Sequence, residues 1–548
     1  MTQKQALEIL KMGHNAFITG AAGSGKTHLL NEYVKYLKAR GVLMGVTAST
    51  GVAATHMNGM TIHAWSGLGI RDKLSKHDLD NLVKKSYLRQ RLDQAKVLVI
   101  DEISMLHHFR LDLIDKIIRA FKRVDAPFGG LQVILCGDFF QLPPVSRGGE
   151  DPARFAYHSP AWENLNLKIC YLDEQHRQSD IEFIEVLNGI RDDKISDSIF
   201  GRLKSCFGKK TEIGIEPTKI YSHNVNVDAE NERELAKITG EIFEYKMSGR
   251  GRGNLTEILK KTCLAPDILR LKVGARVMFV KNNFEAGYAN GTLGAVVDCD
   301  DFGIRVKTVS GKVIEVEKAN WMIEDCGEAI ARITQYPLRL AWAITVHKSQ
   351  GMSLDAAQID LSQSFERGMG YVALSRVRSL AGLSLLGLND MALKVNEEVM
   401  EYDKKFRADS LNHGEELGSL SLAEISAAQK NFLEKIGAGQ PKIKKEKVDT
   451  EKETKKFLLA GRSIEEIAKA RGLKTGTIIS HLEKIKSRDP RFDFSFLANG
   501  IPTAQLEKII KALPRGFGEG GVFRLAPVKE FLGEKFSYEE IRIARLIY

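Results

Sequence analysis

A short loop near the start of the chain has residue types that bind a polyphosphate. Residues 20–27 read Gly-Ala-Ala-Gly-Ser-Gly-Lys-Thr, which matches the G-x-x-x-x-G-K-[ST] pattern. Glycines let backbone N–H groups point inward around phosphates because they carry no Cβ. We expect Lys26 to reach the β- and γ-phosphates and the Thr27 hydroxyl to bind Mg²⁺. With ATP and Mg²⁺ as the predicted cofactors, the predicted binding residues are Gly20, Gly23, Ser24, Gly25, Lys26 and Thr27.

The sequence around this loop fits the same chemistry. Residues 15–19 are a short apolar run of strand type. The residues after the loop repeat at helical spacing up to a glycine: Leu30, Val34, Leu37 and Gly41. A strand, a loop and a helix in this order place the phosphates at a helix N-terminus. The alternative, a glycine-rich turn with a chance Lys-Thr pair, does not explain this context.

Acidic and amide side chains follow two further strand-like runs. Residues 96–100 are continuously apolar and lead into Asp101 and Glu102. Asp101 is expected to hold Mg²⁺ together with Thr27, and Glu102 to position or deprotonate the attacking water. Gln141 follows a second such run, where it would contact the γ-phosphate or the water; a plain proline turn is the alternative. Strands that alternate with helices imply a parallel sheet with ligands at the carboxyl ends of its strands.

The composition is that of a globular protein with a basic balance. The 548 residues are 43% hydrophobic, and two to four domains are expected. Lys and Arg number 80 against 70 Asp and Glu, which favours a polyanionic partner, with simple solubility as the alternative. The six cysteines form no C-x-x-C pair, which suggests a reducing compartment and no zinc site. Without a signal peptide or a long apolar run, we expect a cytoplasmic protein with no membrane partner.

A stretch rich in small and hydroxyl residues follows the second strand-like run, residues 42–47. Thr50 opens a predicted helix there, and His63 and Trp65 come shortly after it. Hydroxyl residues, a histidine and an aromatic close together suit contact with the backbone and bases of a single strand. For Trp65 taken alone, packing in the core is the favoured alternative. The polar residues 66–95 predict a short helical insertion.

Nine segments stand in the order seen in DNA helicases of the Pif-one family, in the RecD-like branch of helicase superfamily one. They are residues 20–27, 50–54, 61–63, 101–105, 111–130, 137–144, 172–178, 340–351 and 371–377. The chain resembles this family over roughly its first 400 residues, and the set is far more specific than any one motif. The resemblance implies two RecA-like motor domains and ATP-driven movement on single-stranded DNA in the 5′→3′ direction.

The resemblance also implies roles for single residues. Gln3 stands where the family has its adenine-reading glutamine, although by composition alone it is an ordinary polar residue. Arg177 and Arg376 match the two arginines that offset charge on the γ-phosphate, the second as an arginine finger. For an arginine outside such a motif, a surface salt bridge would be the expected role. The DNA strand is expected to contact His347, Lys348 and Ser349, with packing of the histidine as the alternative.

The predicted fold class is α/β: two RecA-like P-loop NTPase domains with an inserted small β-barrel, plus a C-terminal all-α helix-turn-helix domain. Short strands with glycine turns predict the barrel. A charged run in the linker is expected to be solvated. The expected bounds are 1–178 and 179–400 for the motor domains, about 265–330 for the barrel, 401–450 for the linker and 451–548 for the last domain.

The last domain resembles the helix-turn-helix domain at the C-termini of some bacterial helicases. A capping box at Ser463 and a glycine turn at Gly472 predict two short helices. Lys474, Lys484 and Lys486 would then contact phosphates. A protein partner, or packing on the motor, remains an equal possibility for this domain.

Together these features predict an ATP-dependent DNA helicase that couples ATP hydrolysis to duplex unwinding in DNA repair, replication or recombination. The partners expected are single-stranded DNA and duplex junctions, and RNA is not excluded because no motif addresses the 2′-hydroxyl. The alternative is a nucleic-acid-dependent NTPase that acts as a translocase or DNA-binding regulator without strand separation.

Overall fold

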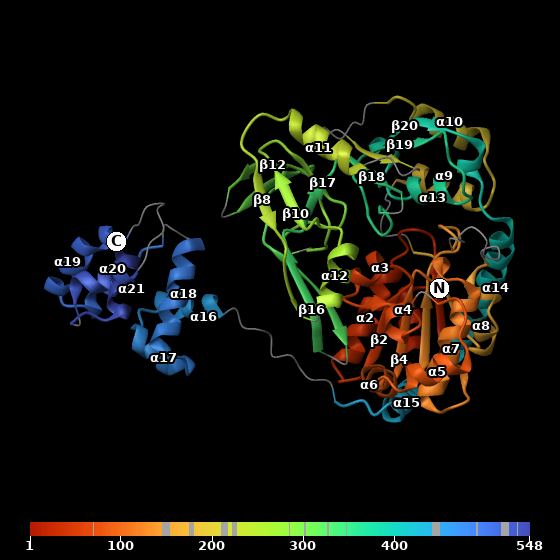
Figure 1. Cartoon of the computed structure of the whole chain (residues 1–548), viewed down its shortest axis with the longest axis horizontal. Coiled ribbons are helices and arrows are strands. Elements are labelled where there is room, and N and C mark those ends of the chain that lie inside the picture. The colour runs from red at the N-terminus through yellow and green to blue at the C-terminus, as the bar shows by residue number, and fades with distance from the viewer. Residues whose placement is uncertain are drawn as a thin grey trace. The chain divides into compact units, whose positions relative to one another are not determined.

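The chain forms two compact units, Met1–Pro441 and Lys442–Tyr548 (Figure 1). No described helix is long and apolar enough to cross a bilayer, and the cytoplasmic location stays a prediction. The computed structural model describes residues 1–69, 71–144, 154–174, 180–209, 217–221, 227–251, 253–283, 285–300, 303–325, 328–346, 348–440, 450–488, 492–516, 525–533 and 535–548.

A six-stranded sheet forms the first half of the larger unit. Its strand order is β3-β2-β4-β5-β1-β6, and neighbouring strands pair in parallel. Strands β1, β4 and β5 are buried at every position, as their continuous apolar runs require in a sheet covered on both faces. The strands are β1 Ala16–Gly20, β2 Met44–Ala48, β3 Met60–Thr61, β4 Val97–Asp101, β5 Gln132–Cys136 and β6 Lys168–Leu172.

Helices connect and cover these strands. Helix α2 buries the apolar stripe expected from its sequence, and it begins directly after Gly25, whose φ of +83° is left-handed. Helices α5 and α6 lie within the segment predicted as a helical insertion. The helices are α1 Gln3–Lys11, α2 Lys26–Lys38, α3 Gly51–His56, α4 Ile62–Ser66, α5 Lys76–Val83, α6 Ser86–Gln94, α7 His108–Lys122 and α8 Pro160–Asn164.

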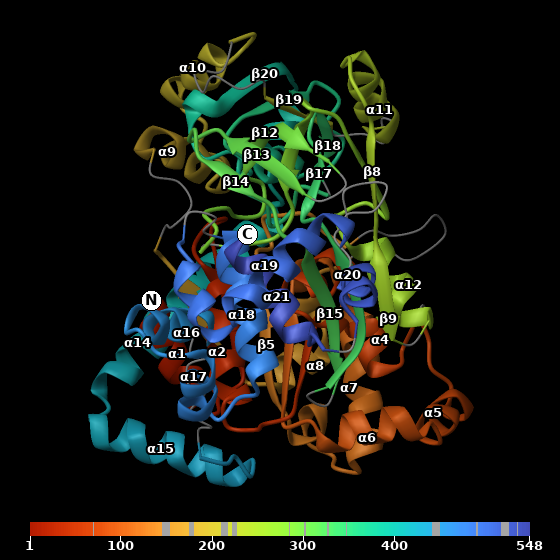
Figure 2. The same ribbon diagram turned by 90° about the vertical axis from the view of Figure 1, so that its left-hand side faces the viewer.

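A second parallel sheet, of order β18-β7-β19-β20, lies at the end of the unit opposite to α5 and α6 (Figures 1 and 2). Two α/β halves with parallel sheets agree with the predicted fold class. The strands are β7 Thr218–Tyr221, β18 Ala343–Thr345, β19 Ala357–Leu361 and β20 Leu383–Leu388. The helices beside them are α9 Ile181–Arg191, α10 Asp197–Ser205, α11 Val227–Lys237 and α13 Met369–Leu374.

Short antiparallel strands lie between β7 and β18 in the chain. They form sheets of five, three and two strands, in the orders β14-β13-β12-β11-β17, β15-β16-β9 and β10-β8. Closure of these sheets into a small barrel stays a prediction. The elements are β8 Phe243–Lys246, β9 Ser248–Gly251, α12 Gly253–Thr262, β10 Ile268–Leu271, β11 Arg276–Phe279, β12 Leu293–Cys299, β13 Ile304–Thr308, β14 Val313–Glu315, β15 Ala319–Asp325, β16 Glu328–Gln335 and β17 Leu338–Leu340.

The linker predicted at 401–450 is wrong for most of its length. Helices α14 (Glu397–Ser419) and α15 (Leu422–Lys435) fill this region and pack on the first half of the unit. Phe406 is buried with its ring 5.2 Å from that of Phe17, and Phe432 is buried in the core beneath α1 and α2. The apolar face of these helices explains the result, because burying it against the sheet is favourable. Residues 441–449 lie outside the described residues.

The described part of the smaller unit is helical. One apolar core joins α16, α17 and α18 with part of α21, and a second joins α19, α20 and α21. The predicted capping box at Ser463 and left-handed turn at Gly472 (φ +62°) are both present. The helices are α16 Thr450–Leu459, α17 Ile464–Arg471, α18 Thr475–Arg488, α19 Thr503–Ala512, α20 Leu525–Leu532 and α21 Tyr538–Ile547.

Candidate active site

The phosphate loop runs from the end of β1 into α2 and lines a cavity of about 560 Å³. Lys26 Nζ donates hydrogen bonds to the backbone oxygens of Gly20 at 2.9 Å and Ala21 at 3.0 Å. A Cβ on Gly20 would lie 2.6 Å from the backbone oxygen of Leu172, so no larger residue fits there. Gly23 is also left-handed, with a φ of +92°. The loop therefore has the turned backbone that an anion cradle needs.

Asp101 and Glu102 lie at the carboxyl end of β4, in the same cavity. Glu102 has a φ of +52°, and its backbone N–H donates to Asp101 Oδ1 at 2.9 Å. Burial, and then the charge of Asp101, raise the pKa of Glu102 to about 7, against the opposing charges of Lys26 and Arg376. Burial also raises the pKa of Asp101. A carboxyl group that titrates near neutral pH is suited to accepting a proton from water.

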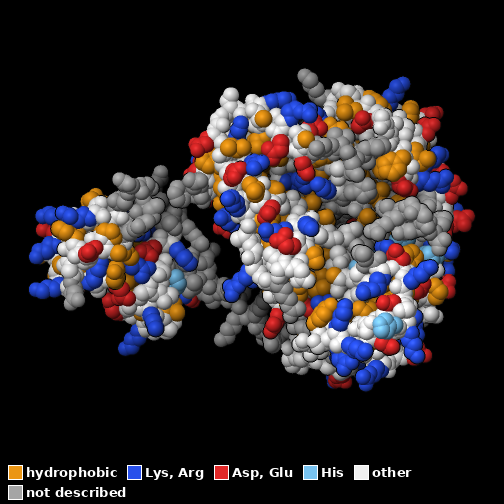
Figure 3. All heavy atoms as spheres, in the orientation of Figure 1, with side chains coloured by type: hydrophobic (Ala, Val, Ile, Leu, Met, Phe, Trp, Pro, Cys, Tyr) orange, Lys and Arg blue, Asp and Glu red, His pale blue; other side chains and the backbone are white. Residues whose placement is uncertain are grey.

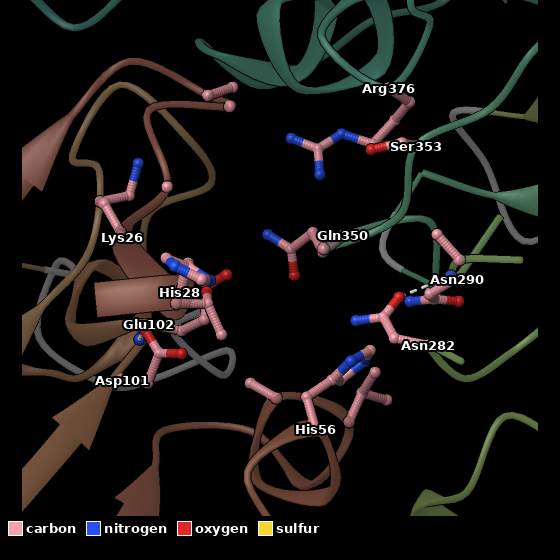
Figure 4. Close-up of a pocket in the computed structure, with 18 of the residues that line it drawn as sticks. Lys26, His28, His56, Asp101, Glu102, Asn282, Asn290, Gln350, Ser353 and Arg376 are labelled. Carbon is pink, nitrogen blue, oxygen red and sulfur yellow. Dashed lines mark hydrogen bonds between the residues drawn. The ribbon is translucent and has the colours of Figure 1, made fainter. Parts of the chain in front are cut away.

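Figure 4 shows that the cavity has two facing walls from distant parts of the chain. The first half of the unit supplies Lys26, Asp101 and Glu102. On the opposite wall, the second half of the unit supplies Gln350, Ser353 and Arg376, and the antiparallel insertion supplies Asn282 and Asn290. Both amide atoms of Asn290 and Nε2 of Gln350 are buried with no hydrogen-bond partner among the described residues. The facing wall is therefore polar and able to bind a further polar group.

Arg376 follows α13 and is only 1% exposed. Its Nε donates to the Val372 backbone oxygen at 2.8 Å, and its Nη2 donates to Ser375 Oγ at 2.8 Å. These bonds orient a cation into the cavity opposite the phosphate loop, as Figure 4 shows. An arginine held this way can stabilise charge that develops on a phosphoryl group.

A buried ion pair joins the two halves of the unit beside this cavity. Arg191, at the end of α9, donates from Nη1 to both carboxylate oxygens of Asp138 at 2.8 Å. Both side chains are at most 2% exposed. Burial alone would raise the pKa of Asp138, but the charges of Arg191 and Lys26 hold it below its usual value. Asp138 also accepts from Gln141 Nε2 at 3.3 Å, which links the pair to a predicted catalytic side chain.

Tyr371 in α13 completes this network. Its phenol oxygen accepts from the backbone N–H of Ala22 at 3.0 Å and from Arg191 Nη1 at 3.0 Å, and donates to Asp138 Oδ2 at 3.4 Å. One hydroxyl donor and two acceptor sites are thus all used. The phosphate loop, α9 and α13 meet at a single buried side chain.

Other predicted contact residues lie in different places. Gln3 Nε2 donates to the backbone oxygen of Ser24 at 3.2 Å, so this amide is beside the phosphate loop. Thr50 caps α3 through its hydroxyl and lines the main cavity. Lys348 lines a second cavity of about 330 Å³, together with the buried Arg339. Gln141 is 7% exposed and lines the main cavity.

Two residues predicted to contact DNA, Trp65 and Ser349, have buried side chains in this structure. Trp65 is 2% exposed and packs against Gly45, where a Cβ would lie 2.5 Å from its ring. Ser349 is fully buried, and its hydroxyl donates to the Val346 backbone oxygen at 2.7 Å. The contacts of both side chains are therefore with the protein itself. His63 is partly buried, and burial lowers its pKa to about 4.

Arg177 and His347, predicted as a phosphate contact and a DNA contact, lie outside the described residues. Sequence reasoning also missed Arg191, Tyr371, Asn282 and Asn290. Tyr371 and Gln350 stand inside segments already singled out, so their motifs were the available signal. Arg191 has no such signal, because its partner Asp138 lies 53 residues earlier in the chain.

The residues present fit a nucleoside triphosphate with Mg²⁺. Ser24 Oγ in the phosphate loop is fully buried and has no partner among the described residues, which suits a bound phosphate oxygen. No described cluster of three or more His, Cys, Asp or Glu could hold a metal by itself. That agrees with the usual Mg²⁺ arrangement, in which one or two protein ligands act together with substrate phosphates. Thr27 and Asp101 both line the cavity and can supply those ligands.

Comparison with known proteins matches these features. A PIF1-like helicase model matches residues 2–199, a 2B domain of DNA helicase Pif1 matches residues 254–299, and a helix-turn-helix domain matches residues 450–545. The chain is 39% identical to the ATP-dependent DNA helicase Pif1 of Psychrobacter sp. (strain PRwf-1), over 99% of each chain.

Solved structures agree. Pif1 of Bacteroides sp in complex with ADP-AlF4 is 31% identical, with a TM-score of 0.65 over 74% of this chain and 96% of that one. Pif1 helicase from Bacteroides in complex with ADP-AlF3 and ssDNA is 32% identical, with a TM-score of 0.51 over the same shares. Because the similarity to the Psychrobacter protein extends along both whole chains, and the motor model matches the residues of the phosphate loop, this chain belongs to the PIF1-like helicase family.

Proposed function

We propose that this protein is an ATP-dependent DNA helicase that moves 5′→3′ on single-stranded DNA and separates duplex strands. The observation that carries the proposal is the cavity between the two α/β halves. There Arg376 from the second half faces Lys26 and Glu102 from the first. The names of the Psychrobacter and Bacteroides relatives support the reaction, and the single-stranded DNA in one Bacteroides complex supports the substrate.

In this proposal each side of the cleft has its own task. ATP with Mg²⁺ supplies the phosphoryl bond whose hydrolysis drives movement. Lys26 and the loop N–H groups bind its phosphates, and Thr27 and Asp101 hold the cation. Glu102 orients a water and accepts its proton, while Gln141 contacts that water or the γ-phosphate.

Two arginines stabilise the negative charge that develops during hydrolysis. Arg376 offsets the charge that builds on the γ-phosphoryl oxygens, because it is buried and already oriented by two hydrogen bonds. Arg177 is the second arginine assigned to charge stabilisation, and Gln3 reads the adenine. Thr50, His63, His347 and Lys348 contact the DNA. Closure of the cleft on ATP and reopening after hydrolysis then advance the protein along the strand.

The domain roles follow from the same proposal. Residues 1–178 and 179–400 act as the two motor domains, and the antiparallel insertion packs against the DNA strand. Duplex junctions are the sites of action, and single-stranded RNA is a competitor to be tested. Residues 451–548 form an accessory domain.

Strand displacement with ATP and Mg²⁺ on two partial duplexes tests the proposal. One duplex carries a 5′ single-stranded tail and the other a 3′ tail. We expect unwinding of the 5′-tailed substrate only, and none with Lys26→Ala, whose binding to single-stranded DNA should persist. Unwinding of the 3′-tailed substrate alone would overturn the polarity. Failure to open either, with ATP hydrolysis still stimulated by single-stranded DNA, would leave a translocase or a regulator.

A further inference from the structure

The basic charge of this protein is concentrated in the smaller unit. Residues 442–548 contain 23 Lys and Arg against 15 Asp and Glu, a net charge of +8, whereas the whole chain carries +10. About a fifth of the chain therefore holds most of the excess. A helical unit with this charge favours a polyanionic partner of its own.

Part of the polar surface of the helix-turn-helix is used for contacts inside the unit. A helix that reads a major groove needs one exposed polar face. On α18 the partly exposed side chains of Thr475, Ser480 and Glu483 are hydrogen-bonded to α21, while Lys474, Thr477 and Lys484 are exposed. Arg542 donates to Ser480 Oγ at 2.8 Å and to Glu483 Oε2 at 2.6 Å, and Thr475 Oγ1 donates to Glu539.

Lys486, one of the lysines expected to contact phosphates, is also engaged. Its Nζ donates to the backbone oxygens of Leu546 at 2.7 Å and Arg545 at 3.3 Å, where it caps the end of α21. The apolar residues of α18 pack into the core together with those of α16 and α17. Four polar side chains of the helix that would enter a groove therefore bond α21 within this unit.

A different face of the same unit combines cations with an exposed aromatic ring. Lys508, Lys511 and Arg515 recur at helical spacing along α19 and the turn that follows it, and all three are exposed. The guanidinium carbon of Arg515 lies 3.8 Å from the ring centroid of Phe531 in α20, and that phenylalanine is 56% exposed. Figure 3 shows Lys and Arg side chains gathered over α19. Two acidic residues of these helices, Glu507 and Glu530, are also exposed.

We propose that this α19–α20 face, formed by Lys508, Lys511, Arg515 and Phe531, is a second binding site for single-stranded DNA. Cations that follow a phosphate backbone, beside an aromatic–guanidinium stack on which bases can stack, are the usual features of a single-strand site. Major-groove readout of a duplex would need the polar residues of α18 instead, and several of these bond α21. This inference rests on the proposed function, which names DNA as the nucleic acid that the protein binds.

The test compares two triple variants of the full chain. One replaces Lys508, Lys511 and Arg515 by Ala. The matched control removes the same charge on the helix-turn-helix side from three other exposed residues, by Lys456→Ala, Arg462→Ala and Lys469→Ala. Binding of a long oligo-dT is measured at several salt concentrations by fluorescence anisotropy, with thermal melting to verify folding.

We expect the first triple variant to bind about tenfold more weakly at 0.1 M salt, and its slope of log affinity against log salt to fall by about 2. The control should keep the wild-type slope. Ultraviolet crosslinking to oligo-dT should map to Phe531 in the wild-type chain, and Phe531→Leu should abolish that crosslink.

Equal affinity and slope for the wild-type chain and the first variant would overturn the site, as would crosslinks absent from α19 and α20. A loss of slope in the control alone would assign binding to the helix-turn-helix instead. Wild-type protein that binds no single-stranded DNA at all would overturn the proposed function, which separates that failure from failure of this site.

Discussion

The phenol oxygen of Tyr371 accepts a hydrogen bond from the backbone N–H of Ala22 at 3.0 Å, although 349 residues separate them in the chain. Ala22 belongs to the phosphate loop, and Tyr371 belongs to the second half of the motor. The same oxygen accepts from Arg191 and donates to Asp138, which also bonds Gln141. The shape of the phosphate loop therefore depends directly on the position of the second half.

Tyr371→Phe removes only the hydroxyl and tests this connection. The Ala22 N–H and one Arg191 N–H would lose a buried partner, at a cost of about 1–3 kcal/mol. We expect KM for ATP to rise several-fold and unwinding per ATP hydrolysed to fall. Steady-state hydrolysis and strand displacement measure both quantities.

Tyr33→Phe is the matched control for that substitution. Tyr33 is fully buried in the first half, and its hydroxyl donates to Gln132 Oε1 at 2.7 Å, within the core beneath α1. It should lower stability without changing KM for ATP. Equal effects of the two variants on KM would mean that Tyr371 has no special connection to the loop.

Arg191→Gln leaves the buried carboxylate of Asp138 without its partner cation. Breaking a buried pair in this way costs about 3–5 kcal/mol. Adding Asp138→Asn should recover part of that loss, because the uncompensated charge disappears. Thermal melting measures the stability of the single and the double variant. Arg305→Gln is the control: it breaks an exposed pair with Asp298 and should cost less than about 1 kcal/mol. A double variant no more stable than the single one would contradict this account.

Hydrolysis should depend on pH through Glu102, whose pKa is raised to about 7. A base acts only when deprotonated, so kcat should rise as pH increases through about 7 and level off above it. Glu102→Gln should lower kcat by at least about 100-fold and abolish this dependence.

The charge of Arg376 lowers the pKa of Glu102, so Arg376→Gln should move the midpoint of the pH profile upward. Arg378→Gln provides the control, since Arg378 lines the same cavity but pairs with Asp355 at 2.7 Å. An unchanged midpoint in Arg376→Gln would show that its charge does not reach the carboxylate. The measurement is kcat across the pH range for all three proteins.

Trp65 should matter for stability and little for DNA. Its ring is buried against Gly45, so Trp65→Ala should cost about 3–5 kcal/mol. Trp65→Phe, which keeps most of the packing, should bind oligo-dT within about twofold of wild type. Denaturation and anisotropy measure these effects. A large loss of DNA affinity at unchanged stability would restore the stacking role.

Local pattern was enough to locate the phosphate loop and the acidic pair after β4. Both depend on neighbours in the chain: a buried strand aims its next residues at one edge of the sheet, and glycines permit the turn there. Residues 20–27 and Asp101–Glu102 were therefore predictable, and the cavity contains all of the predicted catalytic residues that the structure describes.

Long-range packing decided the rest. The composition of residues 401–435 allowed a linker or a pair of helices. Only the surface of the first half beneath Phe406 and Phe432 settles the choice, because burial of those rings drives the docking. Likewise Arg191 and Asp138 attract each other only after the two halves have folded together. An ion pair between distant residues leaves no local pattern in the sequence. Its attraction is strong because both charges are buried at low dielectric constant, and that burial arises only in the folded protein.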